Sequence, residues 1–550
     1  MQLTEQQRVV TAVVACMAIL FVWQFFFSPP PPQEEPVAQR SAEDIPVKGE
    51  AIEPNDPKPL PAAEPVAAEA AKYEEKRLPV VNGLYRAQLT TTDAAFTKFE
   101  LAQYDEAVWV RDGKEVKQDR SREQPVSLVT AEADGAPRQA RLRLDVGGKP
   151  LSIPFVEQVS QVAGRIDLAG TADGLQVVAE IIPDPAAYQL AYEVRVTNQG
   201  SAPRTVSPMV TFGLEQFGGD GSMFAPAPDQ VHGLCVVNGS VERKAVNDVD
   251  EGEPFASSEA AGWAGIDRQY FLVALLPDVE GKNRCKIEAQ GKTLWLDYYL
   301  AAGDIAPGQT AVRKFRIYAG PKRDSEMMRV SPLLKEAINY SLWGIPLGFL
   351  ARPMVFLMNL FHGWTGSWGV AIMCLTFLVK LLLFPVTYRS VMSMRKMQLL
   401  KPELDKLKKQ HEGDKERQQL EQMKLFRERG VNPIGGCLPM LLQMPVWFAL
   451  YRMLWSSVDL YHQPFLWISD LTHAETFPIM AICVGALTFV QQKTTPTTMD
   501  SQQMKMMMYV MPVMFSVFLI ALPSGLVLYI LVNSILTILQ QLAINRRQPA

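Results

Sequence analysis

The sequence predicts a multi-domain membrane protein, with a five-helix polytopic core, an N-terminal anchor helix and an all-β domain outside the membrane. The whole-chain averages are those of a soluble protein, with 48% hydrophobic residues and a net charge of −4 over 550 residues. They conceal two unlike halves. Residues 28 to about 330 are rich in Pro, Gly, Thr, Val and Asp, whereas Leu, Met, Phe, Val and Ile dominate residues 344–545.

Residues 1–28 are the predicted anchor. The apolar run Val9–Phe27 has 19 residues, follows Arg8, and is long enough to cross a hydrocarbon core of ~30 Å. No small-x-small cleavage site follows it, and Ser28 leads into four prolines, which indicates an uncleaved signal anchor. Residues 29–78 are rich in Pro, Ala and Glu and lack apolar periodicity, so they are predicted to be a disordered tether.

Residues 79–325 are predicted to form a β-sandwich domain. Apolar and polar residues alternate in short runs between Asn-Gly, Asp-Gly and Gly-Gly turns, which is typical of half-buried antiparallel strands. The runs are Leu84–Leu89, Ala140–Leu144, Tyr192–Val196 and Thr293–Tyr298. The domain has a single histidine, His232, and no nucleophile elbow, metal-ligand spacing or phosphate loop. We therefore expect His232 to be structural and the protein not to be an enzyme.

The six cysteines do not form a metal motif. No CxxC occurs, and four of the cysteines lie in apolar segments where they act as small hydrophobes. Cys235 and Cys285 lie in the β-domain and could pair in an oxidising compartment, but the sequence leaves their pairing open.

After Ser331 the spacing of apolar residues changes from the period of two that is typical of strands to the period of 3.6 that is typical of helices. Residues 331–364 are interrupted by prolines, Arg352 and His362, and are predicted to be amphipathic helices in the membrane interface. Residues 365–545 form the predicted core, whose five spans are 368–384, 434–451, 477–491, 506–522 and 523–544. The third and fourth spans are short for a normal bilayer, which implies a locally thinned membrane.

The loop 386–430 sets the predicted orientation. It holds twelve bases against seven acids, so we expect it, and both termini, on the cytoplasmic side, and the β-domain on the opposite side. Apolar residues at helical spacing flank His411–Asp414 and predict a helical hairpin, with Pro402 at the start of its first arm. The hairpin is either a plain connector or a docking surface for nascent chains or the ribosome.

Lys380 is the most informative residue. It lies in the otherwise uncharged run Trp368–Phe384, ~18 Å along the axis from Trp368 and ~13 Å from Arg389, so its side chain does not easily reach either interface. A charge at a helix centre costs roughly 2.5–3.5 kcal/mol and normally faces a polar or hydrated interior. The alternative is a partly snorkelled lysine that acts only as an anchor.

Other polar residues mark one face on each of three spans. Thr376 lies four residues before Lys380 and shares its face. The last span carries a polar stripe, and Gln443 adds an amide to the span that begins near Ile434. The stripe consists of Tyr529, Asn533, Thr537 and Gln540. These faces either converge on a hydrated site or join the helices by hydrogen bonds.

Two runs and Lys380 together carry a family resemblance. The runs are Val431–Pro445 (VNPIGGCLPMLLQMP) and Pro523–Tyr529 (PSGLVLY), and Lys380 stands five residues before Pro385. With the anchor, β-domain and five-span core in the same order, the chain resembles the Gram-negative type of the YidC/Oxa/Alb family of membrane protein insertases over essentially its whole length.

The resemblance implies a periplasmic β-supersandwich of sugar-mutarotase-like shape and a hydrophilic groove that is open to the cytoplasm and lipid but closed to the periplasm. The implied groove residues are Lys380, Thr376, Gln443, Tyr529 and Asn533. In the family the positive groove residue is typically arginine; lysine keeps the charge but not the planar fork, so bidentate carboxylate capture is not expected.

The resemblance also implies an insertase and chaperone of the bacterial inner membrane. Its partners would be nascent integral membrane proteins, the Sec translocon and its accessory subunits, the ribosome through the cytoplasmic loops and tail, and membrane lipids. No cofactor, metal or nucleotide is expected.

Two other functions are compatible with parts of the sequence. A secondary transporter or channel could use Lys380 as an ion site, although the spans show no internal repeat and no second ionisable residue. A membrane-anchored carbohydrate-binding or epimerase domain is the other possibility, although five spans are excessive for an anchor.

Overall fold

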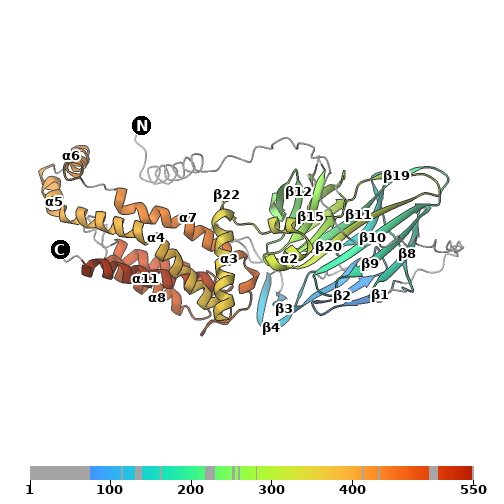
Figure 1. Cartoon of the computed structure of the whole chain (residues 1–550), viewed down its shortest axis with the longest axis horizontal. Coiled ribbons are helices and arrows are strands. Elements are labelled where there is room, and N and C mark those ends of the chain that lie inside the picture. The colour runs from blue at the N-terminus through green and yellow to red at the C-terminus, as the bar shows by residue number, and fades with distance from the viewer. Residues whose placement is uncertain are drawn as a thin grey trace, which may run out of the picture. The chain divides into compact units, whose positions relative to one another are not determined.

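The computed structural model describes residues 75–547 except for 113–114, 130–138, 161–163, 217–229, 250–253, 258–259, 280, 343, 412–413, 431–433 and 495–505. The predicted anchor and nearly all of the predicted tether lie outside the described residues. Figure 1 shows the strands of the β-domain in blue to green and the helices from α3 onward in yellow to red.

Three antiparallel sheets make up the described part of the β-domain. A four-stranded sheet has the order β1 (Arg77–Val81), β2 (Tyr85–Thr90), β3 (Phe96–Asp112), β4 (Glu115–Ser127). A nine-stranded sheet has the order β13 (Ser240–Ala245), β12 (His232–Val237), β15 (Ala261–Asp267), β16 (Phe271–Pro277), β20 (Thr310–Pro321), β10 (Gln189–Asn198), β9 (Leu175–Pro183), β8 (Ile166–Ala172), β7 (Phe155–Gln158). The third sheet has the order β14 (Phe255–Ala256), β17 (Arg284–Gln290), β18 (Thr293–Tyr299), β11 (Arg204–Glu215), β5 (Arg141–Val146), β6 (Lys149–Leu151), with β19 (Gly303–Ile305) beside β11.

The two larger sheets pack as a sandwich. Alternate residues of β10 are buried, as the period of two requires, and β15 of the nine-stranded sheet lies against β11, β17 and β18 of the other. A disulfide between Cys235 on β12 and Cys285 on β17 joins the two sheets, with a Cα–Cα distance of 6.4 Å. The pairing that the sequence left open is therefore present.

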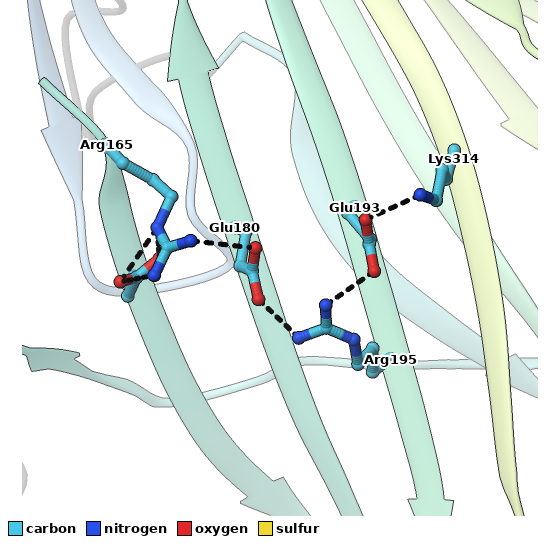
Figure 2. A network of polar contacts seen from close by, with 6 residues as sticks. Arg165, Glu180, Glu193, Arg195 and Lys314 are labelled. Atoms are coloured by element: carbon cyan, nitrogen blue, oxygen red, sulfur yellow. Dashed lines mark hydrogen bonds and ion pairs between the residues drawn. The ribbon is translucent and has the colours of Figure 1, made fainter. Parts of the chain in front are cut away.

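A row of charged residues runs across the neighbouring strands β8, β9, β10 and β20 of the nine-stranded sheet (Figure 2). The register places Glu180 directly opposite both Asp167 and Glu193, an arrangement that is repulsive by itself. Arg195 pairs with both Glu180 and Glu193, and Arg165 lies 2.8 Å from Asp167. The ammonium of Lys314, 2.9 Å from Glu193, lowers the pKa of that carboxyl. The cations thus allow three acids to share one row.

A second charged cluster is buried at the end of β15. Asp267 is only 1% exposed and accepts contacts from Arg243 at 2.7 Å, Lys322 at 3.0 Å and His232 at 3.2 Å. Burial alone would raise the pKa of Asp267, but the charges of Arg243 and Lys322 outweigh it and hold that pKa well below its usual range. Arg243 also donates to the carbonyl of Ala337, so the cluster ties the sandwich to the segment that leaves it.

Short elements connect the sandwich to the core. They are α2 (Asp324–Val330), η2 (Pro332–Ala337), β21 (Ser341–Leu342), β22 (Ile345–Pro346) and α3 (Gly348–Thr365). The first of the helices expected within residues 331–364 is the 3-10 helix η2, because Pro332 begins a segment too short for a full α-helix. α3 buries Ala351, Met354 and Met358 and exposes Phe349, Phe356 and Trp364. Two apolar faces on one helix are suited to packing on one side and contact with lipid on the other.

The core helices are α4 (Trp368–Leu399), α5 (Lys401–Gln410), α6 (Lys415–Glu428), α7 (Ile434–Ser456), α8 (Ile479–Thr494), α10 (Met511–Ile520) and α11 (Ser524–Arg547), with a π-helical turn η4 (Met506–Val510) before α10. By length and composition, Trp368–Leu399 and Ser524–Ile544 are long and apolar enough to cross a membrane, and Ile479–Lys493 and Met508–Ile520 are shorter apolar helices. α4 does not end with its apolar run at residue 384 but passes through Pro385 and continues for four more turns. Leu400, Leu404 and Phe426 form a small apolar cluster between α5 and α6.

Candidate functional site

Lys380 is buried in α4 and has a neutral partner. Its side chain is 8% exposed, and its Nζ donates a hydrogen bond of 2.8 Å to Oγ1 of Thr537 on α11. Within the described ranges, no carboxylate lies within ion-pair distance of Lys380. The charge is therefore hydrogen-bonded but not neutralised, as the absence of acids from the apolar spans predicts.

The polar stripe of α11 faces α4. Thr537 donates its own hydroxyl hydrogen to the carbonyl of Asn533 at 2.6 Å, which leaves the Thr537 oxygen free to accept from Lys380. Gln540 donates from Nε2 to the backbone carbonyl of Lys380 at 3.5 Å. Two residues of the stripe therefore meet the same turn of α4.

Gln443 and Tyr529 connect α7 to the same face of α11. Gln443 donates from Nε2 to the hydroxyl of Tyr529 at 3.1 Å, and Tyr529 is 1% exposed. Thr376, also 1% exposed, donates to the carbonyl of Ile372 in its own helix, so it does not bind Lys380 directly. The structure thus connects Lys380 to α11 and Gln443 to Tyr529, while Thr376 is bonded only locally.

Several buried acceptors in the core helices lack hydrogen-bond partners. At the site, Oδ1 of Asn533 and Oε1 of Gln540 are both buried without one. Oε1 of Gln492, near the end of α8, is likewise buried without a partner. Buried polar atoms are normally satisfied, so these acceptors have the capacity to bind water or a passing polar group. Sequence reasoning did not single out Gln492, although a glutamine pair at the end of an apolar run was an available signal.

The site has the chemistry of polar solvation and attraction. Among the residues that the structure describes, no group of three His, Cys, Asp or Glu side chains could hold a metal ion. The polar cluster, which consists of Lys380, Thr537, Asn533 and Gln540, instead combines a cation that has no carboxylate partner among the described residues with hydroxyl and amide donors and with acceptors that lack partners.

Each half of the chain matches a known protein family. Residues 77–357 match the family described as the YidC periplasmic domain, and residues 360–550 match the family described as 60Kd inner membrane protein. The chain belongs to the YidC family. The family expected from the two motif runs and Lys380 is thus confirmed, and so is the fold class of a membrane core joined to a periplasmic β-sandwich.

Relatives in the YidC family align along almost the whole chain. The membrane protein insertase YidC of Anaeromyxobacter sp. (strain Fw109-5) is 34% identical over 99% of this chain and 98% of its own length. The membrane protein insertase YidC of Saccharophagus degradans is 31% identical over 88% and 86%. A crystal structure of an active YidC insertase with its first transmembrane domain resolved has a TM-score of 0.37 and 19% identity, and covers 86% of this chain and 93% of that one.

Proposed function

We propose that this chain is a membrane protein insertase and chaperone that assists the insertion, folding and assembly of new integral membrane proteins. Its relatives bear the name membrane protein insertase, and they align with both the periplasmic domain and the core. The observation that carries the proposal is Lys380, a buried cation in an apolar helix with only a threonine hydroxyl as its side-chain partner among the described residues.

The mechanism follows from the cost of moving polar segments through lipid. Each charge in the tail of an incoming protein costs about 3 kcal/mol at the centre of a bilayer. A groove lined by Lys380, Thr376, Gln443, Tyr529 and Asn533 would hydrate the tail over part of the distance. At an effective dielectric constant of ~20, Lys380 would attract a carboxylate at 4 Å by about 4 kcal/mol before desolvation. That attraction offsets roughly one buried charge, while the apolar helix of the client moves into the lipid.

The short helices would reduce the remaining dry distance. α8 has 16 residues and α10 has 10. At 1.5 Å per residue α8 spans about 24 Å, less than the ~30 Å hydrocarbon core, so the bilayer beside it would be thinned. No nucleotide-binding motif occurs in the sequence, so the driving force would be client partitioning, the membrane potential or a partner.

The proposed location is the inner membrane, with both termini and the α5–α6 hairpin in the cytoplasm. The twelve bases of residues 386–430 support this orientation. On the hairpin, Leu420 and Met423 are more than half exposed between basic residues, which supports a contact with nascent chains or the ribosome. The Sec translocon and its accessory subunits are further proposed partners.

The test is in vitro insertion of paired clients that differ only in the charge of the translocated tail. We expect Lys380→Arg to preserve insertion, and Lys380→Ala and Lys380→Glu to slow acidic-tail clients most. Lys98→Ala is the control, because Lys98 is a half-exposed lysine of the β-domain, paired with Glu100 at 2.7 Å and outside the membrane core. If Lys380→Ala slows acidic and neutral clients equally, charge attraction is not the role of Lys380.

A further inference from the structure

The connection between α7 and α8, residues 457–478, is fixed to the ends of two helices that carry the polar cluster. On α4, the Phe465 ring lies against Gly369, where a Cβ would be only 2.2 Å from ring atoms. No residue with a side chain fits there unless the ring moves. The ring of Phe465 therefore rests directly on the backbone of the first turn of α4.

On α11, the same connection caps the helix N-terminus. The carbonyl of His473 accepts both the backbone N–H and the hydroxyl of Ser524 at 2.7 Å, and the carbonyl of Leu471 accepts the N–H of Gly525 at 2.8 Å. These are helix N–H groups that have no partner within the helix itself. A Cβ at Gly525 would meet the Leu471 carbonyl at 3.0 Å and Ile372 of α4 at 3.6 Å. The connection, α4 and α11 thus converge at one point.

Asp470 organises this part of the connection. Its Oδ1 accepts both the backbone N–H and the hydroxyl of Thr472 at 2.7 Å, and its Oδ2 lies 2.6 Å from Nδ1 of His473. Nε2 of His462 lies 3.8 Å from the same oxygen. The carboxylate therefore sets the local fold that presents the carbonyls of Leu471 and His473 to α11.

An apolar layer separates this connection from the polar cluster. Ile372 and Leu375 of α4 and Leu526 and Val527 of α11 are at most 2% exposed. Asn533 and Thr537, farther along α11, are only half-buried and polar. The change from apolar to polar along both helices is that expected of a groove that ends before it reaches this side.

We propose that Asp470 is the positioning residue that holds residues 457–478 on the first turns of α4 and α11, and that this connection is the outer seal of the groove, whose closure toward the periplasm the family resemblance implies. This inference rests on the proposed function and its topology, which place the connection on the periplasmic side. By fixing the first turns of α4 and α11 together, the seal excludes periplasmic water and keeps Lys380 in register with Thr537. Phe465 fills the contact with α4, and Ser524 anchors the contact with α11.

The experiment measures the accessibility of Asn533→Cys to a membrane-impermeant maleimide. The four cysteines outside the disulfide, Cys16, Cys374, Cys437 and Cys483, are replaced by serine, and labelling is compared between spheroplasts and inverted vesicles. With an intact seal, Asn533→Cys is labelled from the cytoplasmic side only. Asp470→Ala is expected to raise labelling from the periplasmic side about tenfold, the effect of losing one charge-assisted hydrogen bond on an opening equilibrium.

Three variants make the result specific. Asp470→Asn keeps an oxygen that can accept from Thr472 and is expected to preserve shielding. Glu475→Ala is the matched control, because Glu475 lies in the same connection but its carboxylate accepts from Trp467 and from the N–H of Met480 on α8, and not from the segment that holds α11. Phe465→Ala removes the ring that packs on α4 and leaves Asp470 in place. It tests the seal independently if the Asp470→Ala protein does not accumulate.

The two arms of the experiment separate the two proposals. Periplasmic labelling decides the seal: if Asp470→Ala and Phe465→Ala both leave Asn533→Cys shielded in a folded protein, residues 457–478 are not the seal. Cytoplasmic labelling decides the groove: if Asn533→Cys is unreactive there in the parent protein, the hydrated groove of the proposed function is wrong.

Discussion

Lys380 on α4 and Thr537 on α11, which are 157 residues apart in the sequence, are joined by a hydrogen bond of 2.8 Å. Thr537 can accept this bond because it donates its own hydrogen to Asn533. A neutral partner orients the ammonium without cancelling its charge, whereas a carboxylate would do both. The arrangement therefore keeps the cation available to a negatively charged group that enters the site.

Thr537→Val tests this arrangement, because valine keeps the shape of threonine and removes the acceptor. We expect insertion of acidic-tail clients to fall several-fold, but less than in Lys380→Ala, since the charge remains while its orientation is lost. The double variant Lys380→Ala/Thr537→Val should be no worse than Lys380→Ala alone, because the two residues act through one contact. Thr387→Val is the control, since Thr387 donates only to Leu383 of its own helix. Additive effects in the double variant would contradict the coupling.

The sequence predicts which residues share a face but not which residues meet across helices. The spacing of four residues places Thr376 and Lys380 on one side of α4, and the stripe on α11 follows from the same periodicity. The contact of Lys380 with Thr537 depends on how far one helix slides along the other, and periodicity contains no information on that. Charged residues mark where a span leaves the lipid, but they do not mark where its helix ends. The sequence therefore did not predict that α4 continues past Pro385 to Leu399. The disulfide likewise required the packing of two sheets.

Asp267→Asn is expected to destabilise the β-domain. The substitution removes the charge that balances Arg243 and Lys322, and breaking a buried ion pair costs about 3–5 kcal/mol. Denaturant unfolding of the purified full chain in detergent, followed by tryptophan fluorescence, measures the change. Asp173→Asn, which affects an exposed pair with Arg204, is the control and should leave the midpoint nearly unchanged. Equal midpoints for Asp267→Asn and the parent would show that the cluster does not contribute.

The same cluster predicts a dependence on pH. The folded-state pKa of Asp267 lies below the unfolded value of ~3.9, so its contribution to the free energy of unfolding is fully present above that pH. It is lost as the pH falls from ~3.9 toward the folded-state pKa. The stability difference between the parent and Asp267→Asn should therefore be constant from pH 7 to about 5 and shrink below pH 4. A difference that stays constant down to pH 3 would argue against a charged Asp267.

Removal of the disulfide by Cys235→Ser/Cys285→Ser should lower the free energy of unfolding by up to about 4 kcal/mol. The bond closes a loop with a sequence separation of 50 residues, and its main effect in the chain-entropy description is to restrict the unfolded chain. Denaturant unfolding with and without reductant measures the loss. In the double variant, reductant should have no further effect. A parent protein that is insensitive to reductant while unfolded would show that the bond is not formed.

The orientation of the core predicts opposite labelling of two serines changed to cysteine. Ser393 lies within the twelve-base segment, in the last part of α4, whereas Ser240 is exposed at the start of β13. With positive charge retained on the cytoplasmic side, Ser240→Cys should react with an impermeant thiol reagent in spheroplasts, and Ser393→Cys only after permeabilisation. Both substitutions are made in the background that keeps only the Cys235–Cys285 pair, so that no other thiol reacts. Labelling of Ser393→Cys in sealed spheroplasts would reverse the topology and place residues 457–478 in the cytoplasm.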